Sequence, residues 1–227
     1  MGIHAPVWQA GASCLNFWSM YLSRILLDVS KKNTLQALSN PNRFHGSVER
    51  CFSGERKRNL WRIDNLNGRL YLLILSEDVP DLKMIEKQFS PAYEHGETKS
   101  YDKLLERIKK GSSWQFRIVA NPTKSLSSRD GSRGKVIAIS DREHQKEWLM
   151  KKGEKNGFHL EKGTFDVVQG MWHIFSKRKN NTSMKVSLKS VAFEGKLEIT
   201  DEEKFKYALV KGIGKEKAYG NGLMTII

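Results

Sequence analysis

The sequence has few cysteines and prolines, and it contains no long apolar run. Its two cysteines, Cys14 and Cys51, cannot form a disulfide framework, and no CxxC pair is present to bind structural zinc. No segment approaches the ~18–20 consecutive apolar residues of a membrane-spanning helix. Only 18 of the 227 residues are glycine and 5 are proline, which excludes collagen-like and low-complexity chains. We therefore expect a globular protein of a reducing, cytoplasmic compartment without membrane association.

Acidic residues are also scarce relative to basic ones. The chain has 39 lysines and arginines against 25 aspartates and glutamates, a net charge of +14. Residues 102–192 alone carry 20 basic and 9 acidic side chains, which is +11 of that total. Such a surface attracts polyanions through counterion release, although a basic run is often only a solvated face. Because no long basic amphipathic helix indicates a membrane surface, nucleic acid is the expected partner.

Residues 1–19 contain no charged side chain and no basic segment that would indicate a signal peptide. Pro6, Gln9 and Gly11 interrupt what apolar character the segment has. Met20 directly precedes a strong strand pattern. We therefore expect residues 1–19 to be a leader that is disordered or not native to the protein.

The first half of the remaining chain alternates strand and helix signals. Asn40-Pro41 supplies an N-cap and a proline at the first helical position, and Phe44, Val48, Cys51 and Phe52 form one apolar helix face that ends before Gly54. Asn65-Leu66-Asn67-Gly68 separates two apolar strands as a hairpin turn would. The expected elements are strands at 21–29, 59–64, 69–75 and 97–105, and helices from residue 41 and over 81–89.

The second half repeats this order. Ser140 with Glu143, and Thr200 with Glu203, have the spacing of capping boxes and predict two helix starts. A Ser/Gly/Arg-rich loop at 125–134 follows the first strand, and a glycine-rich loop precedes the last. The expected elements are strands at 114–120, 157–175, 184–198 and 223–227, and helices over 140–152 and 200–211.

Each half therefore reads β-α-β-β-α-β, which is the ferredoxin-like motif. We predict an α+β protein of two tandem ferredoxin-like, RRM-like domains, residues 20–110 and 111–227. The same sheet with two helices on one face is also the scaffold of RNA-recognition domains. The strand aromatics suit either base stacking or core packing, and alternation alone does not separate the two: Trp61, Tyr71, Trp114, Phe116 and Phe193.

Few residues carry a recognisable chemical pattern. Six scattered histidines include no HExxH or comparable spacing, so a metal site is not expected. His45 lies at the margin of the apolar helix face, where an imidazole could act as a general acid or base, although a lone helical histidine is more often an ordinary surface residue. Residues 212–222 match neither a Walker nor a dinucleotide motif. This loop could bind phosphates through backbone amides with Lys215 and Lys217, or it could be a helix C-cap followed by a turn.

Several blocks of sequence together resemble one known family. From Met20 onward the chain resembles the CasE family, the CRISPR-associated endoribonucleases of type I-E systems. The resemblance covers almost all of 20–227, in the family's order and near its spacing. Its blocks are MYLSRILLDV at 20–29, NPNRFH at 40–45, LWRID at 60–64, FRIVANPTK at 116–124, EWL at 147–149, FEGKLEITD at 193–201 and GIGKEKAYGNGLM at 212–224.

The resemblance implies two ferredoxin-like domains that bind the stem-loop of a CRISPR repeat transcript and join the Cascade complex. It implies cleavage at the 3′ base of the stem without metal or cofactor, leaving a 5′-hydroxyl and a 2′,3′-cyclic phosphate. His45 occupies the place of the family's catalytic histidine. Some members carry a tyrosine where this chain has Asn42, whose amide cannot exchange a proton usefully. Arg50, on the same helix, is the predicted stabiliser of the phosphorane charge.

We predict that basic side chains of the second half bind the RNA stem. Two other interpretations stay open: a non-catalytic RNA-binding module of the same fold, or a basic scaffold subunit that contacts protein partners. The predicted RNA-binding residues are Lys124, Arg129, Arg133, Lys135, Lys177, Arg178, Lys179, Lys185, Lys189, Gly212, Gly214, Lys215, Lys217, Gly220 and Gly222.

Overall fold

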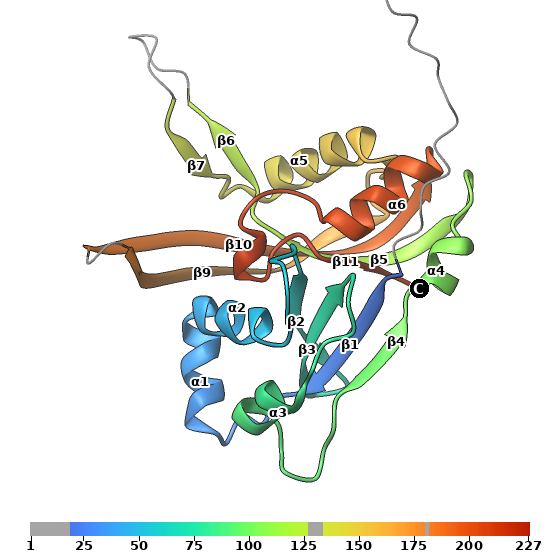
Figure 1. Ribbon diagram of the computed structural model, residues 1–227. Helices are drawn as coiled ribbons and strands as arrows, with labels where there is room; N and C mark the ends of the chain where they lie inside the picture. The colour runs from blue at the N-terminus through green and yellow to red at the C-terminus, as the bar shows by residue number, and fades with distance from the viewer. Residues whose placement is uncertain (1–18, 127–133, 180–181) are drawn as a thin grey trace, which may run out of the picture.

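The structure is a computed structural model that describes residues 19–126, 134–179 and 182–227, apart from the side chains of 177–179 and 182–183. Its strands form two main antiparallel sheets, one from each half of the chain, that lie one above the other (Figure 1). Within the described ranges, no helix has both the length and the apolar character needed to cross a membrane.

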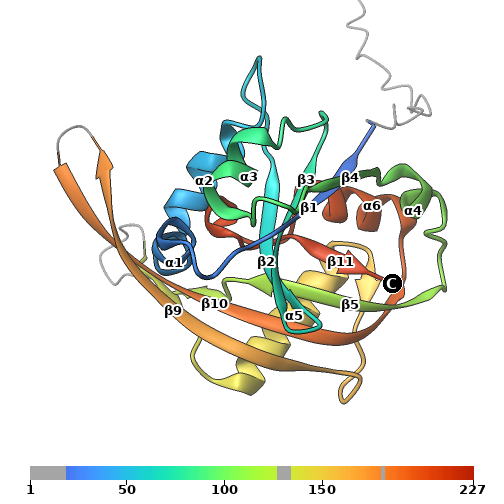
Figure 2. The same cartoon turned by 90° about the horizontal axis from the view of Figure 1, so that it is seen from below.

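The first sheet has the strand order β2-β3-β1-β4, and every neighbouring pair is antiparallel. Helices connect β1 to β2 and β3 to β4, and they cover the face of the sheet that points away from the second half (Figures 1 and 2). The strands are β1 (Tyr21–Leu26), β2 (Leu60–Leu66), β3 (Arg69–Ser76) and β4 (Glu97–Ser100); the helices are α1 (Lys32–Ser39), α2 (Pro41–Glu49) and α3 (Lys83–Phe89).

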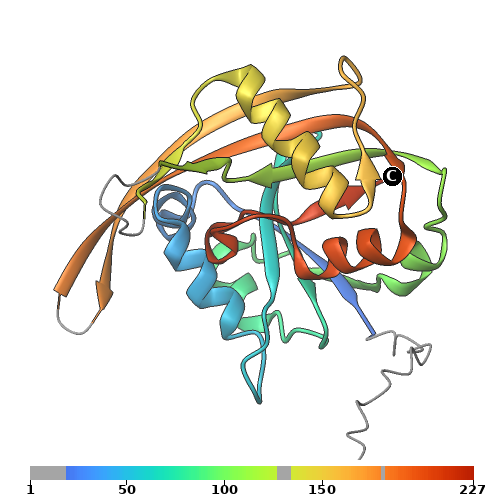
Figure 3. The same cartoon turned by 90° about the horizontal axis from the view of Figure 1, so that it is seen from above.

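The second sheet repeats the arrangement with the order β11-β5-β10-β8, and β9 also pairs with β10. Two helices, α5 and α6, lie on the face away from the first sheet (Figure 3). The elements are β5 (Ser113–Ala120), α5 (Arg142–Lys155), β8 (Phe158–His159), β9 (Phe165–Lys179), β10 (Thr182–Ile199), α6 (Glu202–Lys211), the 3-10 helix η1 (Lys217–Tyr219) and β11 (Met224–Ile226). Both halves therefore have the ferredoxin-like order, and the predicted fold class is confirmed.

Two hairpins extend from the second sheet. The paired ends of β9 and β10 project as a long arm, and a short pair, β6 (Thr123–Ser125) and β7 (Val136–Ala138), rises beside α5 (Figures 1 and 3). The register of the long hairpin shifts between Ala192 and Phe193, which marks a bulge. Both hairpins reach past the compact part of the molecule (Figure 1).

The apolar side chains form two cores. On β3, Leu72 and Ile74 point toward α1–α3, whereas Leu73 and Leu75 point toward the second half. Leu73 and Leu75 belong to one continuous core that also includes Ile118 of β5 and reaches α5 and α6. The two halves therefore share a core along the inner face of the first sheet, and they are not joined by a linker alone.

Some predicted boundaries were wrong by one residue or more. The helix caps are Asp141 and Asp201, which accept the N–H groups of residues three positions later, and not Ser140 and Thr200. The predicted strand at 97–105 ends at Ser100 and gives way to α4 (Asp102–Glu106), and α1 was not predicted. Among the strand aromatics, Trp61, Trp114, Phe116 and Phe193 are buried, which favours core packing over base stacking, while Tyr71 is half-buried.

Candidate nucleic-acid interface and active site

The helix α2 sets the position of His45. Asn40 caps the helix by accepting the N–H of Asn42, and Pro41 occupies the first helical position as predicted. Phe44 and Val48 are fully buried under the sheet, so the helix is fixed in rotation. His45 follows Phe44 at the edge of that face, and 19% of its side chain stays exposed.

The His45 ring lies between a carboxylate and a guanidinium. Its Nδ1 is 3.9 Å from Glu49 Oε1, and its Nε2 is 3.5 Å from Arg56 Nη2. Arg56 Nε in turn donates to Glu49 Oε2 at 2.8 Å. The imidazole therefore faces a polar, charged surface and not the apolar core.

This surface is one wall of a groove of about 680 Å³, which we call the His45 groove. Its walls come from α2, from the segment before β2 and from the loop after α6, so both halves of the chain contribute. Lys57 is paired with Asp78 at 2.8 Å, but the groove still carries more positive than negative side chains. The lining residues are His45, Glu49, Arg56, Lys57, Arg58, Asn59, Gly214, Lys215, Glu216, Lys217 and Ala218.

The glycines of residues 212–222 bring the loop into this groove. Gly212 ends α6, as the C-cap interpretation predicted, and its N–H donates to the Ala208 carbonyl. Beyond it, Gly220 has a φ of +77°, and a Cβ there would lie 2.8 Å from the Trp61 ring. Gly222 has a φ of +94°, and a Cβ there would lie 2.8 Å from the Ile213 carbonyl oxygen. Only glycine permits this close turn against β2, which carries Lys215 and Lys217 to the groove.

A second groove continues the first. It measures about 300 Å³, lies between β6, β7 and α5, and shares Gly214 and Lys215 with the His45 groove. Lys152 lines it and lies 5.4 Å from the centre of the Trp148 ring. The two grooves therefore form one cationic path from α2 to the base of the β6–β7 hairpin.

Lys217 and Arg58 line the His45 groove, and Lys152 lines the second groove that adjoins it. The pKa of Lys217 is lowered, first because the ammonium is partly buried and then because Arg58 and Lys152 lie nearby. Neighbouring positive charges repel one another, which destabilises the charged form of each group. A bound anion relieves this repulsion, so such a cluster favours anion binding. The junction of the grooves is therefore suited to a phosphate group.

The structure separates Asn42 and Arg50 from this path. Both line a different groove of about 350 Å³ on another side of α2, with Arg43 and Gln88. Arg50 Nη2 donates to Ser47 Oγ at 3.0 Å. His45 and Arg50 are five residues apart on the helix, which turns their side chains in different directions. The role predicted for Arg50 stays a prediction, and its present side-chain position does not support it.

The other predicted RNA-binding residues lie along the C-terminal half. Lys124 and Lys135 are exposed on or beside the β6–β7 hairpin, and Lys185 is exposed on β10. Lys189 lies 5.8 Å from the centre of the Trp172 ring, whose side chain is exposed on β9. Arg129 and Arg133 lie outside the described residues. For Lys177, Arg178 and Lys179 only the backbone in β9 is described, paired with β10 at the projecting end of the long hairpin.

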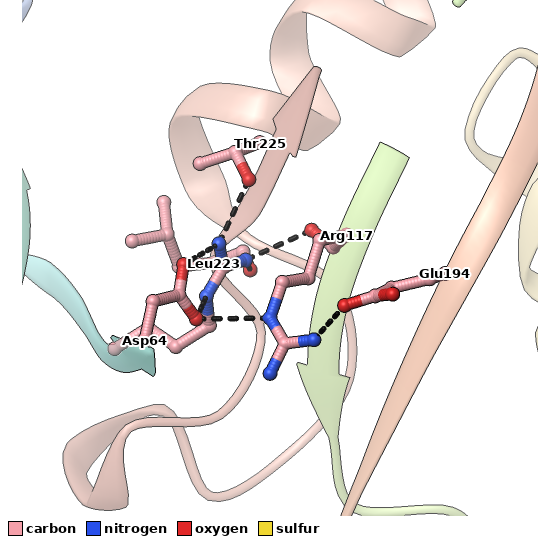
Figure 4. A network of polar contacts seen from close by, with 6 residues as sticks. Asp64, Arg117, Glu194, Leu223 and Thr225 are labelled. Carbon is pink, nitrogen blue, oxygen red and sulfur yellow. Dashed lines mark hydrogen bonds and ion pairs between the residues drawn. The ribbon is translucent and has the colours of Figure 1, made fainter. Parts of the chain in front are cut away.

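A buried charge network joins the two halves beside the grooves (Figure 4). Arg62 of β2, 1% exposed, donates to both carboxylate oxygens of Asp64. It also donates to the carbonyls of Arg117 and Leu223 and to Thr225 Oγ1, each at 2.8 Å. Arg117 links Asp64 at 3.0 Å to Glu194 of β10. The network holds β2 against β5 and β11, and thereby fixes the walls of the His45 groove relative to each other.

Sequence reasoning missed four cations of the path: Arg56, Lys57, Arg58 and Lys152. The first three form a basic run directly before the second strand, and this run was a signal in the sequence. Lys152 was part of a predicted helix, but nothing in its spacing showed which loop it would meet. Within the described residues no group of three or more His, Cys, Asp or Glu side chains is placed to hold a metal ion.

Comparison with known proteins identifies the family. The family described as CRISPR associated protein matches residues 20–227, and the chain belongs to it. The CRISPR-associated endoribonuclease Cse3 of Thermus thermophilus is 26% identical over 219 residues, covering 91% of this chain and 99% of that protein. The predicted resemblance to the CasE family is confirmed by this relative and by the solved structures below.

Two solved structures share the fold at 25% identity or slightly more. Thermus thermophilus Cse3, bound to an RNA that represents a pre-cleavage complex, has a TM-score of 0.75 at 25% identity, covering 92% of this chain and 99% of that one. A chain of a CRISPR RNA-guided surveillance complex has a TM-score of 0.64 at 26% identity, covering 91% and 98%. Escherichia coli Cas6e, at 21% identity and a TM-score of 0.56, shows the same fold.

Proposed function

We propose that this protein is an endoribonuclease that binds the stem-loop of CRISPR repeat RNA and cleaves at the 3′ base of the stem, producing mature crRNA. The observation that carries the proposal is His45, which lines a cationic groove built from both halves of the chain. The relative named an endoribonuclease and the solved complex of Cse3 with RNA support the substrate class.

The side chains that line the groove support a proposal of phosphodiester cleavage by 2′-oxygen attack. The ribose 2′-oxygen upstream of the cut attacks phosphorus, the 5′-oxygen leaves, and the products are a 2′,3′-cyclic phosphate and a 5′-hydroxyl. A histidine can take or give a proton in such a step near neutral pH, which is typically worth ~10²–10⁴-fold in rate. In this proposal Lys215 and Arg58, which line the same groove, offset the charge that grows on the phosphorus oxygens. In this proposal the step needs no metal or cofactor.

The rest of the cationic path supports binding of the stem. Phosphates along an RNA backbone are positioned by lysine and arginine side chains, largely independently of sequence. The path leads from the His45 groove toward the β6–β7 hairpin, and Lys185 and Lys189 extend the basic surface along the long arm. Since a similar chain occurs in a CRISPR RNA-guided surveillance complex, we also propose that this protein joins other Cascade subunits after cleavage.

The test is cleavage of cognate repeat RNA in EDTA under single-turnover conditions. We expect the wild type to cut, and we expect His45→Ala to lose ~10²–10⁴-fold in rate while its RNA affinity persists. The matched control is His159→Ala, since His159 is exposed on β8 and lines none of the grooves described above. A 2′-deoxy substitution at the nucleotide upstream of the cut should also stop the reaction.

Other outcomes would favour the alternatives. Cleavage at the wild-type rate by His45→Ala would contradict the proposed mechanism. Cleavage of the 2′-deoxy substrate would indicate that water is the nucleophile. Tight binding of repeat RNA without cleavage by the wild type would support a non-catalytic RNA-binding module. Unchanged affinity after charge reversal of Lys177, Arg178 and Lys179 would favour a scaffold subunit.

A further inference from the structure

Cleavage by 2′-oxygen attack requires two proton transfers on opposite sides of the phosphorus. His45 can perform one of them, and the other needs a second titratable group in the same groove. Glu49 is held by Arg56, and Lys57 is held by Asp78. Lys215 and Lys217 remain as the cationic candidates in the groove.

Lys217 differs from Lys215 in its surroundings. Lys215 is exposed, whereas Lys217 is half-buried on η1, which packs against α2 and β2. Among the described residues, no carboxylate lies within 4.0 Å of Lys217 Nζ to form an ion pair. A Cβ on Gly222 would lie 3.2 Å from Lys217 Cγ, so the glycine loop encloses the stem of the side chain. The loop thereby holds Lys217 at the groove wall contributed by the second half.

We propose that Lys217 is the general acid that protonates the leaving 5′-oxygen, while His45 accepts the proton of the attacking 2′-hydroxyl. This inference rests on the proposed function and specifies the second catalytic residue of the same site.

The step balances with these two groups. A lone pair of the 2′-oxygen forms the new O–P bond as its proton passes to the imidazole. The P–O5′ bond breaks, its electron pair stays on O5′, and the Lys217 ammonium supplies the proton that makes the 5′-hydroxyl. The reaction leaves a protonated His45 and a neutral Lys217, and exchange with water restores both. Neither oxidant nor reductant is needed.

The environment of Lys217 suits this role. An ordinary lysine holds its proton too tightly for efficient transfer, since general acids work best with a pKa near the working pH. Partial burial lowers the pKa of Lys217, and Arg58 and Lys152 lower it further. The groove also presents His45, Arg56 and Glu49 from α2 and the segment after it, and Lys215 and Glu216 from the loop itself. An entering phosphodiester adds negative charge and keeps the ammonium protonated until O5′ leaves.

A substrate with a 5′-bridging sulfur at the cut distinguishes a general acid from a positioning residue, because a thiolate leaves without protonation. We expect Lys217→Arg to cut the ordinary RNA ~10²-fold or more slowly than wild type, and the sulfur substrate within about threefold of wild type. His45→Ala should be slow on both substrates. Arginine keeps the positive charge, so RNA affinity should change by less than about threefold. Lys204→Arg, an exposed lysine on α6 outside the grooves, is the matched control.

The outcomes separate this inference from the proposed function. If Lys217→Arg cuts the ordinary RNA at the wild-type rate, Lys217 is not the acid. If the variant is equally slow on both substrates, Lys217 only positions or neutralises the phosphate, and the inference is wrong. If the wild type cuts neither substrate, the proposed function itself fails. The pH–rate profile gives a second readout, since Lys217→Arg should lose the fall in rate at high pH that deprotonation of Lys217 causes in the wild type.

Discussion

Two charged regions lie at the contact between the halves, and they are built in opposite ways. In the Arg62 network every guanidinium donor of Arg62 has an acceptor, and Arg62 is 1% exposed. In the His45 groove the cations outnumber the carboxylates, and Arg56 keeps 76% of its side chain exposed. The charges of the Arg62 network are paired with one another inside the fold. The His45 groove keeps an excess of positive charge that can bind an anion from outside.

The difference shows how one interface serves both stability and binding. Burial lowers the pKa of Arg62, and the hydrogen bonds to Asp64 act against that shift, so the buried arginine depends on its partner. The exposed groove cations Arg56, Arg58 and Lys215 have no such requirement because water reaches them. We therefore expect substitutions in the network to act on folding, and substitutions in the groove to act on RNA.

The largest effect should come from removing a partner inside the network. Asp64→Ala leaves the buried Arg62 without its carboxylate and should lower the free energy of unfolding by about 3–5 kcal/mol. Urea denaturation measures this change. The control is Asp166→Ala, because Asp166 pairs with Arg142 on the exposed surface. Equal effects of the two substitutions would contradict the contrast between buried and open charge.

The next effect tests how the glycine loop reaches the groove. Gly220→Ala forces a side chain into a backbone with a φ of +77° and against the Trp61 ring. It should cost about 1–3 kcal/mol of stability and slow RNA cleavage by moving η1. Gly163→Ala is a matched control, since its φ is +89° but nothing lies within 4 Å of the added Cβ. If both variants cleave alike, the contact with Trp61 does not position the loop.

Removing groove cations should weaken binding and leave the fold intact. The double substitution Arg58→Gln and Lys152→Gln should reduce affinity for repeat RNA about tenfold, and should reduce the slope of log affinity against log salt by about 1–2. Fluorescence titration at several salt concentrations measures both quantities. An unchanged salt slope, with reduced thermal stability instead, would assign these cations to folding.

The smallest effect concerns an exposed charge that belongs to neither region. Asp201 caps α6, and hydrogen bonds from the Lys204 side chain and N–H lower its pKa below 3.8. A carboxyl group with a lowered folded pKa stabilises the fold above its unfolded pKa, and this contribution disappears as the pH falls through the folded value. Asp201→Ala should lower Tm by about 2–4 °C at pH 7. The difference from wild type should shrink as the pH falls through the lowered pKa, and a constant difference would exclude the cap charge as its cause.

Local chemistry made much of the fold predictable. Asn40-Pro41 begins α2 as expected, and Asn67-Gly68 forms the turn between β2 and β3 with φ values of +52° and +78°. A hairpin turn with both residues at positive φ favours this dipeptide, so the sequence specifies the structure. The cap residues were misplaced because an aspartate follows each predicted serine or threonine, and aspartate caps a helix as well as serine does and better than threonine.

The arrangement of the site was less predictable, since it depends on contacts between distant segments. His45 could be placed on a helix edge from its neighbour Phe44, but its facing residues come from the segment before β2 and from residues 214–218. Arg50 was expected beside His45 because both lie on one helix, yet Ser47 holds it in another groove. The spacing of residues along a helix predicts the direction in which each side chain points around the helix axis. It does not predict which distant loop faces that side chain in the folded protein.

The Arg62 network also has a consequence for how the protein is made. Arg62 leaves the ribosome early, but two of its acceptors, Leu223 and Thr225, are separated from it by 161 and 163 positions. Until translation passes Thr225, the guanidinium cannot be buried with all its donors satisfied. The nascent first sheet should therefore keep its inner face open to water or to chaperones, and the final docking of the two halves should follow synthesis of β11.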